Sequence, residues 1–120
     1  MCIRWLCCVL LLPWTTAFAG NADVVDVAVR KTGPAVYRFD VTVAHDDAGW
    51  DHYANHWDVV TLDGQVLGSR TLYHPHVDEQ PFTRRLSGVN IPAEVKRVEL
   101  RAYDSVHGGG GATIVVDVPN

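Results

Sequence analysis

The sequence predicts an all-β protein that folds as a seven-stranded antiparallel sandwich, and three observations support this fold class. Apolar and polar residues alternate with period two through most of the chain after residue 20. No stretch of about eleven or more residues carries the apolar stripe of an amphipathic helix. Turn residues recur at intervals of about 8 to 12 positions, which is the spacing of the short strands in sandwich domains.

The first two strands are predicted close to residue 20. Valines alternate with other residues over positions 25–30, and the Lys-Thr-Gly-Pro sequence at 31–34 is a turn that ends this strand. The second strand spans residues 37–43 and has one apolar and one polar face. Its apolar face consists of Tyr37, Phe39, Val41 and Val43.

A hairpin is predicted in the middle of the chain. Residues 56–62 form a third strand, and Asp63-Gly64 is a favoured two-residue hairpin turn because both positions tolerate positive φ. Residues 65–73 should therefore fold back antiparallel as the fourth strand.

Three further strands complete the prediction. A short fifth strand covers residues 82–87, and a turn at 91–94 leads into the sixth strand near 98–103. The glycine run at 108–111 lacks the lysine and the strand-turn-helix setting of a phosphate-binding loop, so it is interpreted as a flexible hairpin connection. The last strand covers residues 112–118.

The corner Ile91-Pro92 and the strand after it resemble the turn before the sixth strand of fibronectin-like domains. The predicted architecture is therefore similar to the immunoglobulin and fibronectin III-like β-sandwiches. A small β-barrel is the alternative architecture.

An export signal is predicted at the start of the chain. Residues 1–19 combine a single charge at Arg4, an apolar run and the small-x-small pattern Ala17-Phe18-Ala19, which predicts cleavage after Ala19. An uncleaved anchor is the alternative, but the run is interrupted by Pro13 and is shorter than the roughly 20 apolar residues of a membrane span. Residues 20–120 then form a single domain with no membrane span.

Composition narrows the function classes. The chain is 48% hydrophobic and 20% charged, which is typical of a globular domain. Its formal net charge of -4 argues against general electrostatic binding to the phosphates of nucleic acid. All three cysteines lie within residues 1–19, so the exported domain would have neither a disulfide nor a thiolate metal site.

The histidines are predicted to gather at one end of the sandwich. If consecutive strands reverse direction, the second, fourth and sixth connections share one pole, and these cover roughly residues 45–55, 74–81 and 104–111. These connections and their borders hold all six histidines, namely His45, His52, His56, His74, His76 and His107. The same connections contain the carboxylates Asp46, Asp47, Asp51, Asp78, Glu79 and Asp104.

A cluster of histidines without cysteine predicts a metal site with nitrogen and oxygen ligands, which favours Cu(II) or Zn(II). His74-Pro75-His76 is the most suggestive element, because Pro75 biases His74 towards extended geometry. In that geometry residues i and i+2 point to the same side, so the two imidazoles could converge on one ion.

Further ligands are predicted from the neighbouring connections. His107, just before the glycine run, could supply a third ligand, and His45 or His52 a fourth. The alternative is that these histidines only form hydrogen bonds within loops, and for His56, which begins a strand, a structural role is expected.

The aromatic residues of the second connection suggest a different kind of site. Trp57 is expected to be the buried tryptophan that sandwich domains carry on the third strand. Trp50 and Tyr53 could instead stack on a sugar or on the side chains of a protein partner. No nucleophile elbow is present, so hydrolase chemistry is not expected, although a metal with an open position leaves metal-assisted chemistry open.

Three segments resemble a family of small uncharacterised exported bacterial proteins. They are Gly49-Trp50-Asp51-His52-Tyr53-Ala54, the segment from Leu67-Gly68-Ser69-Arg70 to His74-Pro75-His76-Val77-Asp78-Glu79-Gln80-Pro81-Phe82-Thr83-Arg84, and Ala102-Tyr103-Asp104-Ser105-Val106-His107-Gly108. The resemblance implies a Gram-negative periplasmic setting and brings no activity with it.

The function predicted from the sequence is that of a periplasmic or secreted protein that binds a divalent transition metal, copper or zinc, and is not an enzyme. It would act as a carrier, a sensor or a metal-dependent interaction module. The alternative is a metal-free module that binds a periplasmic protein or a glycan through the same loops. Nucleic acid is not an expected partner.

Overall fold

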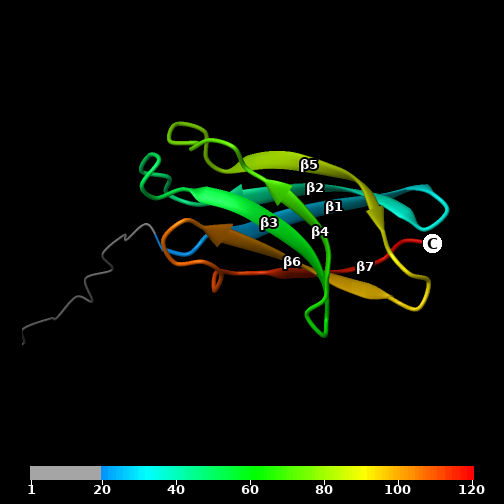
Figure 1. The fold of residues 1–120 in the computed structure, drawn as a ribbon. Helices are drawn as coiled ribbons and strands as arrows, with labels where there is room; N and C mark the ends of the chain where they lie inside the picture. Colours follow the sequence, from blue (N-terminus) through cyan, green and yellow to red (C-terminus); the bar gives the residue numbers. More distant parts are fainter. Residues whose placement is uncertain (1–19) are drawn as a thin grey trace, which may run out of the picture.

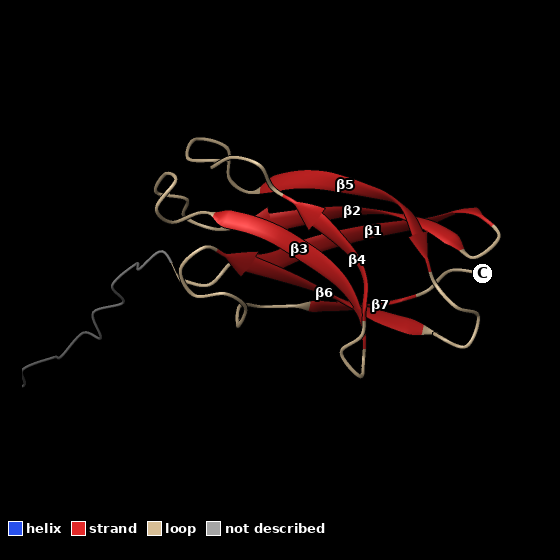
Figure 2. Cartoon of the chain, viewed as in Figure 1, coloured by secondary structure: helices blue, strands red, loops and turns tan. Residues whose placement is uncertain are grey.

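The chain folds into seven strands arranged as two antiparallel sheets (Figure 1). This computed structural model describes residues 20–120. The strands are β1 (Asp23–Gly33), β2 (Val36–Ala44), β3 (Ala54–Thr61), β4 (Val66–Thr71), β5 (Phe82–Asn90), β6 (Arg97–Asp104) and β7 (Ile114–Asp117). Within this part of the chain there is no helix, and so none that could span a membrane (Figure 2).

The two sheets pack as a sandwich. One sheet has the strand order β1-β2-β5 and the other the order β4-β3-β6-β7, with antiparallel pairing throughout. The all-β sandwich predicted from the alternating pattern is confirmed. Because the two sheets remain separate, the alternative of a closed barrel is wrong.

The core lies between the sheets and follows the period-two pattern of the sequence. All four apolar residues of the β2 face are buried, with Phe39, Val41 and Val43 fully so. Val98 and Leu100 of β6 meet them from the other sheet, together with Trp57 of β3, which is also fully buried. A slip of one residue in any of these strands would turn its buried side chains to solvent, so burial of this face fixes the register.

The first turn differs from the prediction. The segment 31–34 does not end the strand, because β1 continues to Gly33, with Lys31 paired to Tyr37 and Gly33 paired to Val36. A register shift between Lys31 and Gly33 allows this extension. The connection is therefore only Pro34 and Ala35, and Ala35 adopts a φ of 58°.

The central hairpin turn is also longer than predicted. The amide of Gly64 donates to the carbonyl of Thr61, and the amide of Thr61 donates to the carbonyl of Gln65. This pattern closes a three-residue loop, Leu62–Gly64, in place of the predicted two-residue turn Asp63-Gly64. Only Gly64 within it has positive φ, at 93°, so glycine supplies the left-handed position at the end of the loop.

The second, fourth and sixth connections lie together at one end of the sandwich, as the strand count predicts (Figure 1). Hydrogen bonds join them directly: the His76 amide donates to Asp47 at 2.7 Å, and the Ser105 amide donates to the carbonyl of Tyr53 at 2.9 Å. The segment that precedes β1 enters at this same end (Figure 1). We call this end the histidine pole, made of residues 20–22, 45–53, 72–81 and 105–113.

Candidate metal centre

Three potential metal ligands converge at the histidine pole. One atom from each of His45, His52 and Asp104 lies within 4.8 Å of the other two. Nε2 of His45 is 3.2 Å from Nε2 of His52 and 4.0 Å from Oδ2 of Asp104. Nε2 of His52 is 3.2 Å from Oδ1 of Asp104. We call these three residues the His-His-Asp cluster.

The strand ends and one tight turn bring the cluster together. His45 directly follows β2, and Asp104 is the last residue of β6, where it pairs with Ala54 at the start of β3. The His52 amide donates to the carbonyl of Gly49, whose φ of 123° suits glycine alone among common residues. This turn folds His52 back towards the two strand ends.

A buried carboxylate orients the His45 ring. Nδ1 of His45 is 2.5 Å from Oδ1 of Asp47, and both side chains are fully excluded from solvent. Because a carboxylate can only accept, Nδ1 carries the proton, and Nε2 is directed at the cluster. Carboxylates bonded to the far nitrogen of a histidine in this way fix the orientation of metal-binding imidazoles.

Hydrogen-bond acceptors meet around Nε2 of His45. It lies 3.0 Å from the carbonyl oxygen of Gly20, and the carboxylate of Asp104 is close by. Oδ2 of Asp104 is buried and has no hydrogen-bond partner within residues 20–120. A cation bound between these atoms would offset the repulsion between them.

Asp104 is held in the ionised form that a metal ligand needs. Its burial acts to raise the pKa of the carboxyl, but the backbone amides of His107 and Val106 donate to Oδ1, at 2.6 and 2.8 Å. These bonds, with the nearby imidazoles of His107 and His45, outweigh the burial, so the pKa of Asp104 is lowered from its ordinary value.

His107 lies at the rim of the cluster. Its Nδ1 is 3.2 Å from Oδ1 of Asp104, and its ring centroid is 4.9 Å from that of His52. The side chain is 42% exposed, so it can turn towards the cluster or towards solvent. His107, His45 and His52, all predicted ligands, are thus brought together by the structure.

His74 and His76 form a separate pair on the other side of Asp47. Their ring centroids are 4.5 Å apart, as the extended His-Pro-His geometry predicts. His76 is buried, stacks on Phe82 at 3.9 Å, and its Nε2 accepts a bond of 2.9 Å from Arg84. Its Nδ1 lies 3.9 Å from Oδ2 of Asp47. The guanidinium of Arg84 occupies one nitrogen, so His76 packs beside the cluster and is not part of it.

The environment of His76 gives a testable dependence of stability on pH. Burial and the adjacent Arg84 lower the pKa of His76 below its ordinary value of 6.5. The unfolded chain therefore takes up this proton at higher pH than the folded chain, and the free energy of unfolding falls as pH drops through 6.5. Between pH 7.5 and 5.5, His76→Gln should lose less stability than wild type in urea unfolding with a chelator present.

The control for this experiment is Val77→Ala, because this neighbouring side chain is exposed and does not titrate, so the pH slope should be unchanged. Equal slopes for wild type and His76→Gln would contradict the expectation.

The aromatic residues divide as expected. Trp57 is fully buried, whereas Trp50 is 68% exposed and packs edge-on against Tyr53 with ring centroids 5.6 Å apart. His56 stacks flat on Tyr103 at 4.3 Å and lies on β3, apart from the His-His-Asp cluster.

Asp104 is the candidate ligand that the ligand set drawn from the sequence omits. Its sequence signal is its position: it ends an alternating strand and precedes His107 by three residues, which lets its carboxylate accept the amides that follow. Without knowledge of the strand register, the sequence does not distinguish Asp104 from the other loop carboxylates.

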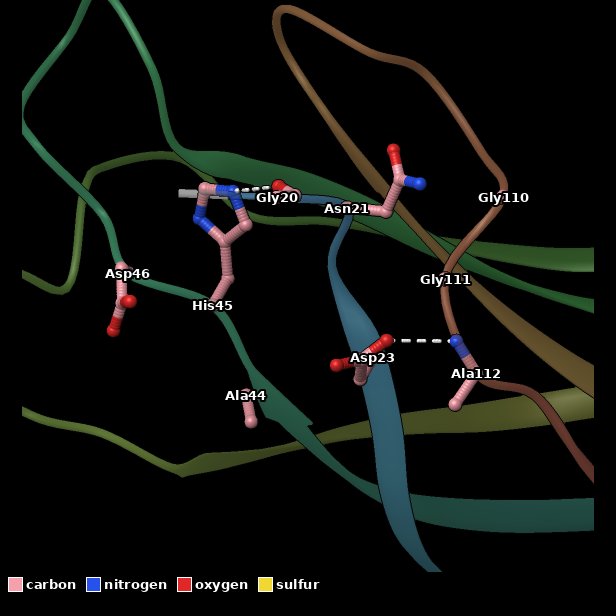
Figure 3. A pocket seen from close by; sticks show the side chains of 9 residues that line it. All are labelled: Gly20, Asn21, Asp23, Ala44, His45, Asp46, Gly110, Gly111 and Ala112. Carbon is pink, nitrogen blue, oxygen red and sulfur yellow. Dashed lines mark hydrogen bonds between the residues drawn. The ribbon is translucent and has the colours of Figure 1, made fainter. Parts of the chain in front are cut away.

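A pocket opens beside the cluster (Figure 3). It has a volume of about 450 Å³. Its lining comes from Gly20, Asn21, Asp23 and residues 44–46 and 110–112, and in its wall Nε2 of His45 lies 3.0 Å from the carbonyl oxygen of Gly20. Gly20 and Asp46, which line this pocket, are exposed.

Fold and site together define a β-sandwich protein with a histidine-carboxylate cluster at one pole. No family model matches the chain. A protein of Halomicrobium mukohataei named "Putative lipoprotein" is 44% identical over 97 residues, which are 81% of this chain and 47% of that protein. The chain thus spans about half the length of this relative. A superoxide reductase from Giardia intestinalis superposes with a TM-score of 0.48 at 13% identity, covering 80% of this chain and 99% of that one.

Proposed function

We propose that this is an exported protein that binds one divalent transition-metal ion through His45, His52 and Asp104. The observation that carries the proposal is the convergence of their three ligand atoms within 4.8 Å. The buried Asp47-His45 contact supports it, because it directs Nε2 at the cluster before any ion arrives.

The donor set selects the class of ion. Two imidazole nitrogens and one carboxylate suit Zn(II) and Cu(II) better than the hard cations Ca²⁺ and Mg²⁺, which prefer oxygen ligands. Three side-chain ligands leave coordination positions open for water or for a further donor. A site with open coordination positions fits an ion that is exchanged, so we propose a carrier, a sensor or a metal-dependent interaction module.

Export is the second part of the proposal. The leader predicted for residues 1–19 lies outside the described residues, and the name of the haloarchaeal relative supports a location in the cell envelope or outside the cell. We propose a periplasmic or secreted protein. The periplasm supplies metal ions without the thiol competition of the cytosol, which suits a site built without cysteine.

Metal titration of residues 20–120, which contain both sheets, tests this function. We expect one-to-one binding of Zn(II) or Cu(II) with sub-micromolar affinity at pH 7.5, measured by isothermal titration on a tagless chain. His52→Ala should weaken binding by about 100-fold or more, which corresponds to about 2.7 kcal/mol. His52 is suited to this test because its side chain is partly exposed and its closest polar contacts, at 3.2 Å, are with the other two cluster residues.

The matched control is His74→Ala at the same pole. Its side chain is exposed, and its removal should leave the affinity within about threefold of wild type. If His74→Ala abolished binding and His52→Ala did not, the His-Pro-His element would be the site. Weak binding of several ions would refute the metal site and favour the metal-free module that uses Trp50 and Tyr53.

A further inference from the structure

Gly20 is placed to become a metal ligand once the leader is removed. Cleavage after Ala19 would make it the first residue, and its carbonyl oxygen is already 3.0 Å from Nε2 of His45 (Figure 3). We propose that the free α-amino group and the carbonyl oxygen of Gly20 complete the site formed by His45, His52 and Asp104. This inference rests on the proposed function and on the predicted cleavage.

The chemistry of the peptide bond explains why cleavage matters. In the uncleaved chain the nitrogen of Gly20 is an amide, whose lone pair is delocalised into the preceding carbonyl and is a poor donor. Hydrolysis of the Ala19-Gly20 bond frees an amine, whose lone pair can bind Zn(II) or Cu(II) when the ion displaces its proton. The amine and carbonyl of one residue can then close a five-membered chelate ring.

Gly20 is held at the cluster by the residues that follow it. Ala22 is fully buried, the Asp23 carboxylate accepts the Ala112 amide at 2.7 Å, and the Val24 amide donates to the Ala112 carbonyl at 2.8 Å. The start of β1, and with it the preceding residue Ala22, is therefore fastened to the connection between β6 and β7. A ligand anchored two residues from the core needs little ordering when it binds.

Gly111 permits this attachment. A Cβ at Gly111 would lie 2.0 Å from the carbonyl oxygen of Ala22, a contact that no side chain could make without displacing the backbone. The glycine run interpreted from sequence as a flexible connection thus includes a position of close packing. Because of this close packing, residues 20–22 run against the connection between β6 and β7 and reach His45.

The pocket beside Gly20 lies at the edge of the completed site. Gly20 and His45 both line it, and the carboxylates of Asp23 and Asp46 are on its border (Figure 3). Negative charge at the mouth of a site attracts cations. Metal affinity would then depend on export, because the precursor lacks the amine and the processed chain has it.

Two chains that differ by one residue test the inference. The first begins at Gly20 and the second at Ala19, and both are titrated with Zn(II) and Cu(II) at pH 7.5. We expect the Gly20 chain to bind at least about tenfold more tightly, equivalent to about 1.4 kcal/mol. Urea unfolding without metal should give equal midpoints, since the sheets are unchanged.

As a control, His52→Ala is introduced into both of these chains, because a free amine alone can bind copper weakly. Tight binding that persists in the Gly20 chain after His52→Ala would show an amine site independent of the cluster and overturn the inference. Equal affinity of the Gly20 and Ala19 chains would overturn it as well, while the proposed function stands. Absence of tight binding to either chain would refute both.

Export of the full-length chain provides the last measurement that tests this inference. The mass of the protein recovered from the periplasm of a bacterial host should correspond to a chain that begins at Gly20. A chain that begins at any other residue would overturn the inference.

Discussion

Replacing Asp47 by alanine is expected to lower the free energy of unfolding by about 3–5 kcal/mol. Asp47 is buried, and its Oδ1 accepts from the Ala54 amide at 2.9 Å as well as contacting His45. Its Oδ2 accepts from the His76 amide at 2.7 Å. Alanine would leave these donors without partners in a site that water does not reach, and each such donor costs about 1–3 kcal/mol.

The same substitution should weaken metal binding. Without Asp47 the His45 ring loses the acceptor that holds Nδ1, so Nε2 is no longer directed at the cluster. Loss of such a supporting carboxylate typically costs about 10- to 100-fold in metal affinity. Isothermal titration on the folded fraction measures this effect, and urea unfolding without metal measures the stability.

Asp46→Ala is the matched control, because the adjacent carboxylate is exposed. Its effect on stability should be within about 0.5 kcal/mol. A loss below about 1 kcal/mol for Asp47→Ala would contradict the structure, because buried donors without partners cannot cost so little.

These contacts make Asp47 the link between two connections that are distant in sequence. It fixes His45 after β2 and the backbone of His76 before β5, and so it places the His-Pro-His pair against the cluster. His74 and His76 attract attention in the sequence, yet their described contacts are with Pro75, Phe82, Arg84 and Asp47.

The strands could be predicted because burial on one face imposes a period of two. The alternation in β2 and β6 is visible in the sequence and matches the burial in the structure. The turns were less predictable. The pairing of Lys31 with Tyr37 and the three-residue loop ending at Gly64 depend on bulges and on φ values, which a pattern of apolar residues does not encode.

The position of the site could also be predicted, but the grouping of its side chains could not. The parity of the strand count places all the histidine-bearing connections at one pole. The choice between His52 and His74 as neighbours of His45 depends on the tight turn at Gly49 and on Arg84 bonding to His76. Those contacts are set by tertiary packing, and no local sequence pattern contains them.

The core offers a second large effect on stability, at Trp57. Its side chain is fully buried between the sheets, so Trp57→Ala is expected to cost about 3–5 kcal/mol through lost apolar contacts and the cavity that remains. A domain of this size commonly has only about 5–15 kcal/mol in total. Most molecules of this variant should therefore be unfolded in mild urea, and only the folded molecules should bind metal.

Trp57→Phe separates the contribution of the aromatic ring to stability from that of the buried Nε1 atom. Nε1 of Trp57 is buried without a hydrogen-bond partner in residues 20–120, so phenylalanine removes an unsatisfied donor as well as part of the ring. Its cost should be clearly below that of alanine, whereas Trp50→Ala, at a side chain 68% exposed, should change stability by no more than about 0.5 kcal/mol. Equal losses for phenylalanine and alanine in urea unfolding would mean that Nε1 bonds to a group or water inside the core, since only then would removing it carry a penalty.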